Sequence, residues 1–160
     1  MSIETVYILC GLPGSGKTTW VEGFTRNFDP RDLFIYSTDD LIERWAKEQE
    51  KTYSEIWEKS IKDATTEMNE RLEEAKKTKK FIVWDQTNLS RKKRNRIVQK
   101  FPTASILYVC FKVSSKTLHH RLSNRPGKVI PQQILEKMIE SFEIPGMDTN
   151  EQPVIYVGDF

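Results

Sequence analysis

The sequence has few cysteines and no long apolar run, and both absences limit what the chain can be. Its two cysteines, Cys10 and Cys110, each lie in an apolar run typical of a strand, so we expect buried reduced thiols and no disulfide. No apolar run approaches the roughly 20 residues that cross a bilayer, and residues 1–4 lack the basic region that begins a secretory signal. We therefore expect an intracellular, cytoplasmic protein without a membrane partner.

Acidic side chains are missing from residues 86–135, although the chain as a whole is nearly balanced, with a formal net charge of +2. The same stretch holds eleven lysines and arginines. Residues 1–85 hold 13 basic against 17 acidic side chains, and residues 136–160 hold one against six. Such a stretch can form ordinary solvated helix faces, or it can form a surface that faces a polyanion. Both interpretations stay open at this point.

Short apolar runs alternate with helical patterns along the chain. The runs at 5–10, 33–37, 81–84 and 105–111 are typical of buried strands, and a last strand fits at 154–157. Helical patterns occupy 17–28, 38–49, 53–77, 90–101, 114–124 and 131–142. This alternation predicts an α/β fold with a mostly parallel sheet of four to five strands and helices on both faces. The length predicts a single domain, residues 1–160.

A glycine-rich loop lies between the first predicted strand and the first predicted helix. Residues 11–18 read GLPGSGKT and fit the phosphate-binding P-loop pattern G-x-x-x-x-G-K-[ST] without exception. Its glycines let backbone N–H groups turn inward around a phosphate, and the following helix presents its positive end. A glycine-rich turn without a ligand is the alternative. The residues expected to hold ATP are Gly11, Leu12, Pro13, Gly14, Ser15, Gly16, Lys17, Thr18 and Thr19.

Within this loop, two side chains have chemistry of their own. Lys17 should reach the β- and γ-phosphates, and the Thr18 hydroxyl should ligate Mg²⁺. The loop between a strand and a helix predicts the three-layer sandwich of P-loop NTPases. It does not by itself separate kinases from ATPases, GTPases or motor domains.

Carboxylates follow the second and third predicted strands. Asp39 and Asp40 come after the second strand, and Asp85 comes directly after the third. In an open parallel sheet, ligands bind beyond the carboxyl ends of the strands. Transfer to a hydroxyl needs a carboxylate that takes its proton, and a metal shell needs carboxylates that hold it through water. We assign both tasks to Asp39 and Asp85; a helix N-cap at Asp39 and a capped turn at Asp85 are the structural alternatives.

Other P-loop classes fit the sequence less well. The N/T-K-x-D motif that reads guanine in GTPases is absent. A chain of 160 residues leaves no room for the sensor region of larger ATPases. A basic loop at about 121–131 instead suits the lid of a small kinase.

Four segments together resemble a known family. Residues 11–20 (GLPGSGKTTW), 37–40 (STDD), 85–89 (DQTNL) and 121–131 (RLSNRPGKVIP) occur in the order found in the 5′-kinase domain of bacteriophage polynucleotide kinase and related repair kinases. The resemblance spans about residues 3–144. It implies transfer of the γ-phosphoryl group of ATP, with Mg²⁺, to a 5′-hydroxyl end of DNA or RNA.

The resemblance also implies roles for single residues. Asp39 would be the general base for the 5′-hydroxyl, and Asp85 would support the metal and the acceptor region. Arg125 would be the lid arginine that stabilises charge on the transferring group, and Arg121 would help to hold the nucleotide.

The sequence departs from the phage pattern in three ways. Ile42 stands where the phage enzymes carry an arginine for the acceptor phosphate, and Arg44 is the nearby cation. The segment Asp-Gln-Thr-Asn at 85–88 is closer to the form in eukaryotic repair kinases. The chain leaves no room for the family's 3′-phosphatase domain, so we expect the kinase domain only.

Two other functions remain open beside the polynucleotide kinase. A kinase for a nucleoside or nucleotide would share the P-loop and lid but would not need the basic stretch. A non-catalytic nucleic-acid-binding protein could carry a similar P-loop. Trp45, Tyr53 and Trp57 could stack on a terminal base, although aromatic residues at this spacing also suit a core.

Overall fold

A five-stranded sheet forms the centre of the computed structural model, which describes residues 2–146 and 152–159. The strand order is β2-β3-β1-β4-β5, and every neighbouring pair is parallel. The prediction of four to five mostly parallel strands, including a last strand near 154–157, is therefore confirmed. The strands are β1 (Thr5–Cys10), β2 (Leu33–Tyr36), β3 (Phe81–Trp84), β4 (Ser105–Lys112) and β5 (Val154–Gly158).

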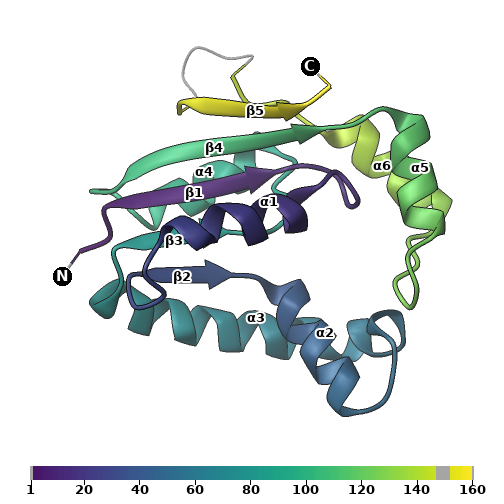
Figure 1. The fold of residues 1–160 in the computed structure, drawn as a ribbon, viewed down its shortest axis with the longest axis horizontal. Helices are drawn as coiled ribbons and strands as arrows, with labels where there is room; N and C mark the ends of the chain where they lie inside the picture. The colour runs from purple at the N-terminus through teal and green to yellow at the C-terminus, as the bar shows by residue number, and fades with distance from the viewer. Residues whose placement is uncertain (1, 147–151, 160) are drawn as a thin grey trace.

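Helices cover both faces of this sheet (Figure 1). In that view α1 lies in front of the strands and α4 lies behind them. The first helix is shorter than the sequence predicts, because it ends at Phe24 and continues as a 3₁₀ turn at Thr25–Asn27. The helices are α1 (Lys17–Phe24), α2 (Thr38–Glu48), α3 (Tyr53–Thr78), α4 (Arg91–Gln99), α5 (Ser115–Ser123) and α6 (Gln132–Ser141).

Alternation along the strands divides the core into two clusters. Ile8 of β1 belongs to the cluster that packs against α2, α3 and α4, whereas its neighbour Leu9 belongs to the cluster that packs against Val21 of α1. Successive side chains of a strand point to opposite faces, so each strand supplies both clusters. The result is the predicted three-layer α/β sandwich.

The strand order determines where the chain changes direction. After β1 the chain runs outward to the edge strand β2, and after β3 it crosses β1 to reach β4. Ligands in open α/β sheets bind at the carboxyl ends of the strands, at such a reversal. The loop after β1 therefore lies at the point of the fold that is best suited to a ligand.

Serine and threonine side chains begin α2 and α3. The Ser37 hydroxyl accepts a hydrogen bond from the Asp40 N–H at 3.1 Å. Thr52 and Glu55 form a reciprocal capping box at the start of α3. The alternative role of Asp39 as the cap of α2 is therefore wrong, since Ser37 caps this helix and Asp39 lies in its first turn with its carboxylate directed elsewhere.

The two cysteines are buried and are not joined in a disulfide, as the sequence predicts. They are register partners on adjacent strands, Cys10 on β1 and Cys110 on β4. Among the described residues, no helix is long and apolar enough to cross a membrane.

Candidate active site

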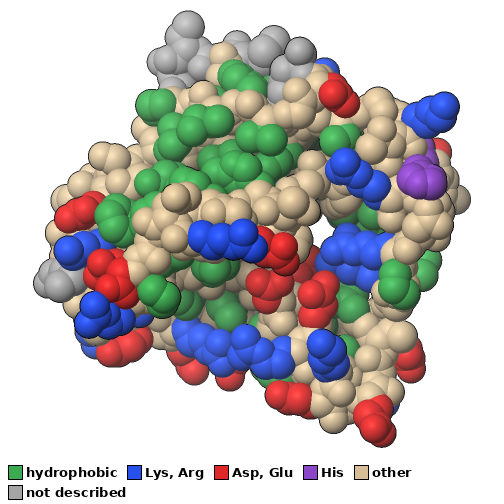
Figure 2. All heavy atoms as spheres, viewed as in Figure 1, with side chains coloured by type: hydrophobic (Ala, Val, Ile, Leu, Met, Phe, Trp, Pro, Cys, Tyr) green, Lys and Arg blue, Asp and Glu red, His purple; other side chains and the backbone are tan. Residues whose placement is uncertain are grey.

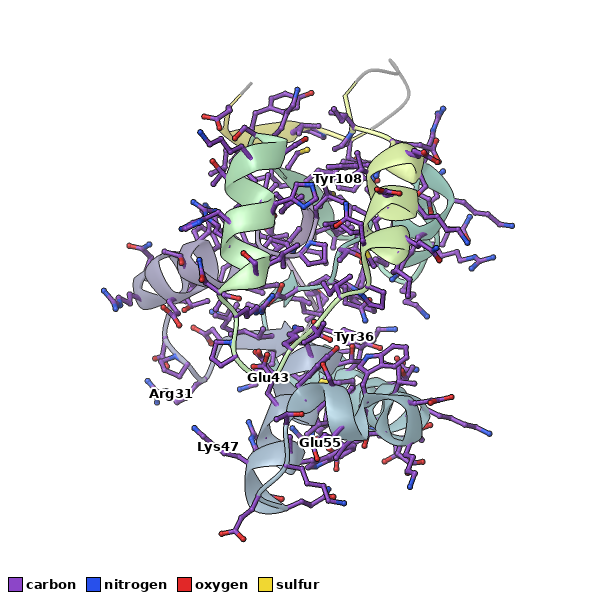
Figure 3. All side chains as sticks on the ribbon, turned by 90° about the vertical axis from the view of Figure 1, so that its right-hand side faces the viewer. Arg31, Tyr36, Glu43, Lys47, Glu55 and Tyr108 are labelled. Carbon is purple, nitrogen blue, oxygen red and sulfur yellow. The ribbon has the colours of Figure 1, made fainter. Side chains whose placement is uncertain are left out.

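A cavity of about 1150 Å³ opens at the carboxyl edge of the sheet. Figure 2 shows basic and acidic side chains on opposite sides of a hollow at this end of the molecule. Figure 3 turns this edge toward the viewer, with α5 and α6 above and with α2 and α3 below. Every predicted site residue lines the cavity except Gly11 and Leu12, the first two residues of the loop. The lining includes Asp39, Asp85, Arg121, Arg125 and residues 13–19.

The glycine-rich loop is shaped by close contacts that only glycine permits. A side-chain carbon on Gly11 would lie 2.7 Å from Ser15 Oγ and 2.9 Å from Phe111 Cβ. Gly14 and Gly16 have φ angles of +80° and +102°, a left-handed conformation that L side chains rarely adopt. The backbone can therefore curl tightly enough to enclose a small anion.

The start of α1 leaves donors for such an anion. Gly16 occupies the N-cap position without a side-chain hydrogen bond, and the first backbone bond of the turn is from Trp20 N–H to Gly16 C=O. Ser15 Oγ is buried and has no hydrogen-bond partner among the described residues. Unpaired N–H groups at a helix N-terminus favour negative charge. This loop therefore fits the phosphates of a nucleotide.

Lys17 lies folded into the loop that it belongs to. Its Nζ donates hydrogen bonds to the carbonyl oxygens of Gly11 and Leu12 at 2.7 and 2.8 Å. Burial lowers the pKa of Lys17 to about 8, although the negative charges of Asp85 and Asp39 act in the opposite direction. A phosphate group in the cavity would add negative charge and favour the protonated form.

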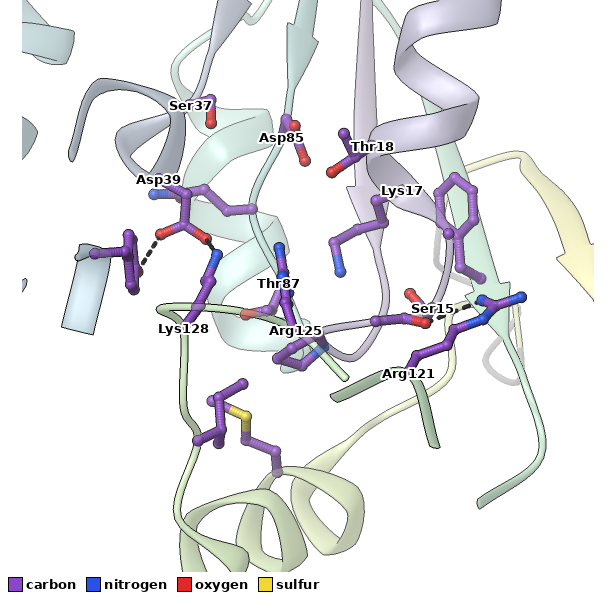
Figure 4. A pocket seen from close by; sticks show the side chains of 18 of the residues that line it. Ser15, Lys17, Thr18, Ser37, Asp39, Asp85, Thr87, Arg121, Arg125 and Lys128 are labelled. Atoms are coloured by element: carbon purple, nitrogen blue, oxygen red, sulfur yellow. Dashed lines mark hydrogen bonds and ion pairs between the residues drawn. The ribbon is translucent and has the colours of Figure 1, made fainter. Parts of the chain in front are cut away.

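Asp39 is held by two side chains from other parts of the chain (Figure 4). The Tyr53 hydroxyl donates to Asp39 Oδ1 at 2.6 Å, and Lys128 Nζ donates to Asp39 Oδ2 at 3.0 Å. Burial alone would raise the pKa of Asp39, but attraction to Lys128 and these hydrogen bonds hold it below its usual value. Asp39 is therefore ionised at neutral pH.

Asp85 stands in a more crowded environment. Its backbone N–H donates to the Tyr36 carbonyl at 2.8 Å, which fixes the residue at the end of β3. Burial, followed by repulsion from Asp40, raises the pKa of Asp85 to about 6, and Lys17 opposes the change. A cation beside this carboxylate would offset the free-energy cost of keeping it ionised.

The Asp85 carboxylate and the Thr18 hydroxyl point toward one another across the cavity (Figure 4). Both are hard oxygen donors of the kind that Mg²⁺ prefers. The described residues contain no cluster of three or more His, Cys, Asp or Glu side chains that could hold a metal alone. Mg²⁺ at such sites keeps several waters and binds the nucleotide phosphates, so one or two protein oxygens suffice.

The segment after β3 connects the cavity to the P-loop. The Gly11 N–H donates to the Thr87 carbonyl at 2.9 Å, and Asn88 Nδ2 donates to the Leu9 carbonyl at 2.7 Å. The buried Arg94 donates to the carbonyls of Asn88 and Leu89 at 3.0 and 3.1 Å. These hydrogen bonds fix the end of β3 relative to the phosphate loop.

The loop between α5 and α6 comes down against the other side of the cavity (Figure 3). The Ser54 N–H donates to the Gly127 carbonyl at 3.1 Å, and the Val129 N–H donates to Ser54 Oγ at 2.9 Å. Gly127 has a φ of +73°, and a side chain there would meet Thr52 at 3.2 Å. The loop is thus docked on the start of α3, which encloses the cavity.

Two arginines of this region face the phosphate loop. Arg121 Nη1 donates to the Gly14 carbonyl at 3.0 Å. The Arg125 side chain points into the cavity between Lys128 and Lys17 (Figure 4). The predicted lid therefore brings positive charge to the side where a terminal phosphate would lie.

Lys128 and Tyr53 are site residues that the sequence did not identify. Lys128 is buried, lies 4.3 Å from the Tyr53 ring centroid and 3.6 Å from Glu43 on α2. For Tyr53 the sequence indicates only base stacking or a place in the core. The place of Lys128, three residues after Arg125 in the lid, was a hint that it belongs to the site. Its contact with Asp39 could not be predicted, because the two residues are 89 positions apart in the sequence.

The aromatic residues and the residues near the acceptor position differ in whether they line the cavity. Trp45 packs against the core, whereas Trp57 is 41% exposed and lines the cavity. Ile42 is fully buried in the core, and Arg44 is exposed and does not line the cavity. The lysine that does line it on this side is Lys93 of α4.

Known proteins share the sequence pattern over most of the chain. The family AAA_33, described as an AAA domain, matches residues 6–145. L-seryl-tRNA(Sec) kinase of Methanococcus maripaludis is 28% identical over 143 residues, which are 87% of this chain and 52% of the relative. The chain thus spans about half the length of that curated relative.

Solved structures share the fold at lower identity. Chaetomium thermophilum Kti12 in complex with ADP-AlF3 has a TM-score of 0.65 at 17% identity, covering 96% of this chain and 88% of that chain. A chain of the Pnkp1/Rnl/Hen1 RNA repair complex has a TM-score of 0.63 at 24% identity, covering 88% and 44%. A gluconokinase from Sinorhizobium meliloti has a TM-score of 0.57 at 18% identity, covering 99% and 84%. At these identities the likeness is one of fold.

Proposed function

Because the chain belongs to the AAA_33 family of P-loop kinases, we propose that it is an ATP-dependent polynucleotide 5′-hydroxyl kinase, which phosphorylates 5′-hydroxyl ends of DNA or RNA. The observation that carries this proposal is the position of Asp39. It is an ionised carboxylate that faces the same cavity as Lys17 and lies under a lid that carries Arg125. A phosphoryl acceptor with a hydroxyl group needs such a carboxylate, whereas simple ATP binding does not.

The phosphate loop and the lid hold the nucleotide in this proposal. Backbone N–H groups of residues 14–19 surround the β-phosphate, and Lys17 turns from its loop carbonyls to the β- and γ-phosphates. Thr18 would ligate Mg²⁺ and Asp85 would hold it through water; the bound ion would neutralise charge on the phosphates. Arg121 of α5, which bonds to the Gly14 carbonyl of the phosphate loop, helps to hold the nucleotide, and Arg125 stabilises charge on the transferring group.

Asp39 takes the proton in the transfer step. The 5′-hydroxyl oxygen forms a bond to the γ-phosphorus, the bond from that phosphorus to the β–γ bridging oxygen breaks, and the hydroxyl proton passes to Asp39. ADP leaves with the bridging oxygen. Each oxygen of Asp39 accepts one hydrogen bond, from Tyr53 or Lys128, so each keeps a lone pair for the hydroxyl proton. Residues 1–160 act as one kinase domain, with residues 121–131 as the lid.

The charge of the second half of the chain supports a nucleic acid as acceptor. Residues 86–135 carry eleven basic side chains and no acidic one, and they include α4 and the lid. Phosphate groups of a strand attract such a surface without regard to sequence. A small neutral acceptor would gain nothing from it.

A second candidate is a hydroxyl that is attached to RNA through another group. The similarity to L-seryl-tRNA(Sec) kinase over 87% of the chain favours it. Asp39 and the basic stretch would serve this acceptor equally well, because it also joins a hydroxyl to a polyanion.

Transfer of radiolabel from [γ-³²P]ATP separates these candidates. The acceptors are a 5′-hydroxyl RNA, a 5′-hydroxyl DNA, the same strands with a 5′-phosphate, seryl-tRNA, and free nucleosides. We expect label on the 5′-hydroxyl strands and none on the 5′-phosphorylated ones, with Asp39→Asn as the inactive control. Label on seryl-tRNA alone would favour the second candidate, and label on nucleosides alone would refute both.

A further inference from the structure

The acceptor side of the cavity lacks the cation that the resemblance leads one to expect there. Ile42 stands at that position, is fully buried and packs in the core. Arg44 lies on the exposed side of α2, away from the cavity. A strand whose 5′-hydroxyl reaches Asp39 carries its first phosphate only one nucleoside farther away. That phosphate needs a different partner.

Lys93 is suitably placed to be this partner. It lies in the first turn of α4 and lines the same cavity as Asp39 and Trp57. It forms no ion pair with a carboxylate of the described residues. Desolvation lowers the pKa of Lys93, and the negative charge of Asp39 opposes this shift, so the ammonium lies within electrostatic reach of the proposed base. A phosphate nearby would favour the charged form of this ammonium.

The outer side of α4 continues this positive charge away from the cavity. Lys92 and Arg96 are exposed and lie four residues apart, so they share one side of the helix about 6 Å from each other along its axis. They line a second cavity of about 590 Å³. No acidic residue occurs within α4. This second cavity is lined by Arg91, Lys92, Asn95, Arg96, Gln99 and Glu143.

We propose that Lys93 binds the phosphate that follows the 5′-terminal nucleoside and that Lys92 and Arg96 bind the next phosphates of the same strand. The ligand is a single strand with a 5′-hydroxyl end, held through its backbone and not through its bases. This inference rests on the proposed function and names how that acceptor is held. Lys93, Lys92 and Arg96 would then form a track along α4 that binds the phosphates of the strand from the reaction cavity to the outer surface.

Acceptors of increasing length test each part of the track. Adenosine carries no phosphate, adenosine 3′-monophosphate carries one, and a ten-residue 5′-hydroxyl oligoribonucleotide carries nine internal phosphates. Steady-state kinetics with each acceptor are measured for the wild type, Lys93→Ala, Lys93→Arg and the double variant K92A/R96A. The matched control is K59A/K62A, which removes two exposed lysines from α3.

The expected effects differ between the variants. Lys93→Ala should raise the KM for adenosine 3′-monophosphate relative to adenosine by about tenfold or more, as loss of a charge-assisted hydrogen bond does, and Lys93→Arg should restore it. K92A/R96A should raise the KM for the oligonucleotide relative to the monophosphate. Binding of the oligonucleotide, measured by fluorescence anisotropy against salt, should lose about one unit of slope for each contact removed. K59A/K62A should match the wild type.

The outcomes separate this inference from the proposed function. If the wild type labels the oligonucleotide and the KM ratios of the variants equal those of the control, the track is refuted and the kinase assignment stands. If the wild type labels neither phosphate-bearing acceptor, both are refuted. Circular dichroism shows that each variant is folded, which is expected because all the substituted side chains are exposed.

Discussion

Lys128 Nζ lies 3.0 Å from Asp39 Oδ2, so an ion pair joins the lid to the carboxylate that we propose as the base. Tyr53 completes the arrangement, since its hydroxyl donates to the other oxygen and its ring lies under the ammonium. The lid thus helps to hold the pKa of Asp39 below its usual value.

Replacing Lys128 by methionine should raise the pKa of Asp39. The pKa is now held below its usual value against the effect of burial, and attraction to Lys128 is the largest force that lowers it. A ¹³C NMR titration of the Asp39 carboxyl group measures the change. Lys128→Arg, which keeps the charge, is the control and should stay close to the wild type. An unchanged midpoint in Lys128→Met would contradict the role of this ion pair.

Asparagine at position 39 should abolish most transfer while leaving ATP bound. The amide cannot take the hydroxyl proton, and loss of general-base catalysis costs about 10²–10⁴ in rate. ATP binds at the phosphate loop, which Asp39 does not touch with a hydrogen bond in the described residues. Turnover with the oligonucleotide and calorimetric ATP affinity are the two measurements. Retained turnover, or lost ATP affinity, would show that Asp39 has another task.

Replacing each of the two lid arginines by alanine should change a different kinetic constant. Arg125→Ala should lower kcat by about 10³–10⁵, as loss of an arginine does in phosphoryl transfer. Arg121→Ala should act mainly on the KM for ATP, because Arg121 bonds to the Gly14 carbonyl of the phosphate loop. Steady-state kinetics of both variants provide the comparison. A merely twofold effect of Arg125→Ala would mean that another cation, such as Lys128, supplies the charge.

Alanine at Gly127 should loosen the docked lid. The φ of +73° costs an L residue about 1–2 kcal/mol, and the new carbon would crowd Thr52 at 3.2 Å. Trypsin should then cleave faster after Lys128, which is buried in the docked loop. Gly23→Ala is the matched control, because Gly23 lies within α1 with no atom within 4 Å of the added carbon. That change should stabilise the protein by about 0.5–1 kcal/mol. Equal cleavage rates for the two variants would contradict a docked lid.

Stability without nucleotide should fall as the pH rises through the range where Asp85 titrates. Its folded pKa of about 6 lies above the unfolded value near 3.8, so the folded state holds the proton more tightly. Below pH 3.8 the group is protonated in both states and has no effect; above pH 6 the full cost is present.

Asparagine at position 85 should remove this cost. Urea unfolding at pH 8 should show Asp85→Asn to be more stable than the wild type, by up to about 3 kcal/mol at 1.36 kcal/mol per pKa unit. The difference should vanish near pH 4. Asp63→Asn, at an exposed position on α3, is the control. A wild type that is the more stable at pH 8 would mean that Asp85 is not strained by burial.

Local sequence patterns were sufficient to predict the fold and the phosphate loop. The pattern at residues 11–18 combines glycines with a lysine and a threonine, and each depends only on its immediate neighbours along the chain. Strand periodicity predicted β1 to β5, and the end of each strand predicted that Asp39 and Asp85 would meet at one edge. The cavity lining includes both.

Other features were not predicted, either because neighbouring side chains compete for one role or because the residues in contact are distant in sequence. The cap of α2 is Ser37, two residues before Asp39, because its hydroxyl accepts the Asp40 N–H. The partner of Asp39 is Lys128, which is 89 positions away. Ile42 faces the core, and it is Lys93 of α4 that lines the cavity.

By itself, the sequence determined a parallel α/β sheet, a loop for phosphates and a basic second half, since periodicity, glycine conformation and charge are properties of neighbouring residues. Only the tertiary structure decided that the lid docks on α3, that Tyr53 and Lys128 lower the pKa of Asp39, and that Lys93 of α4 lines the cavity. The physical reason is that hydrogen bonds, ion pairs and desolvation act over a few ångströms in space. Which groups come within that distance depends on how the whole sheet and its helices pack.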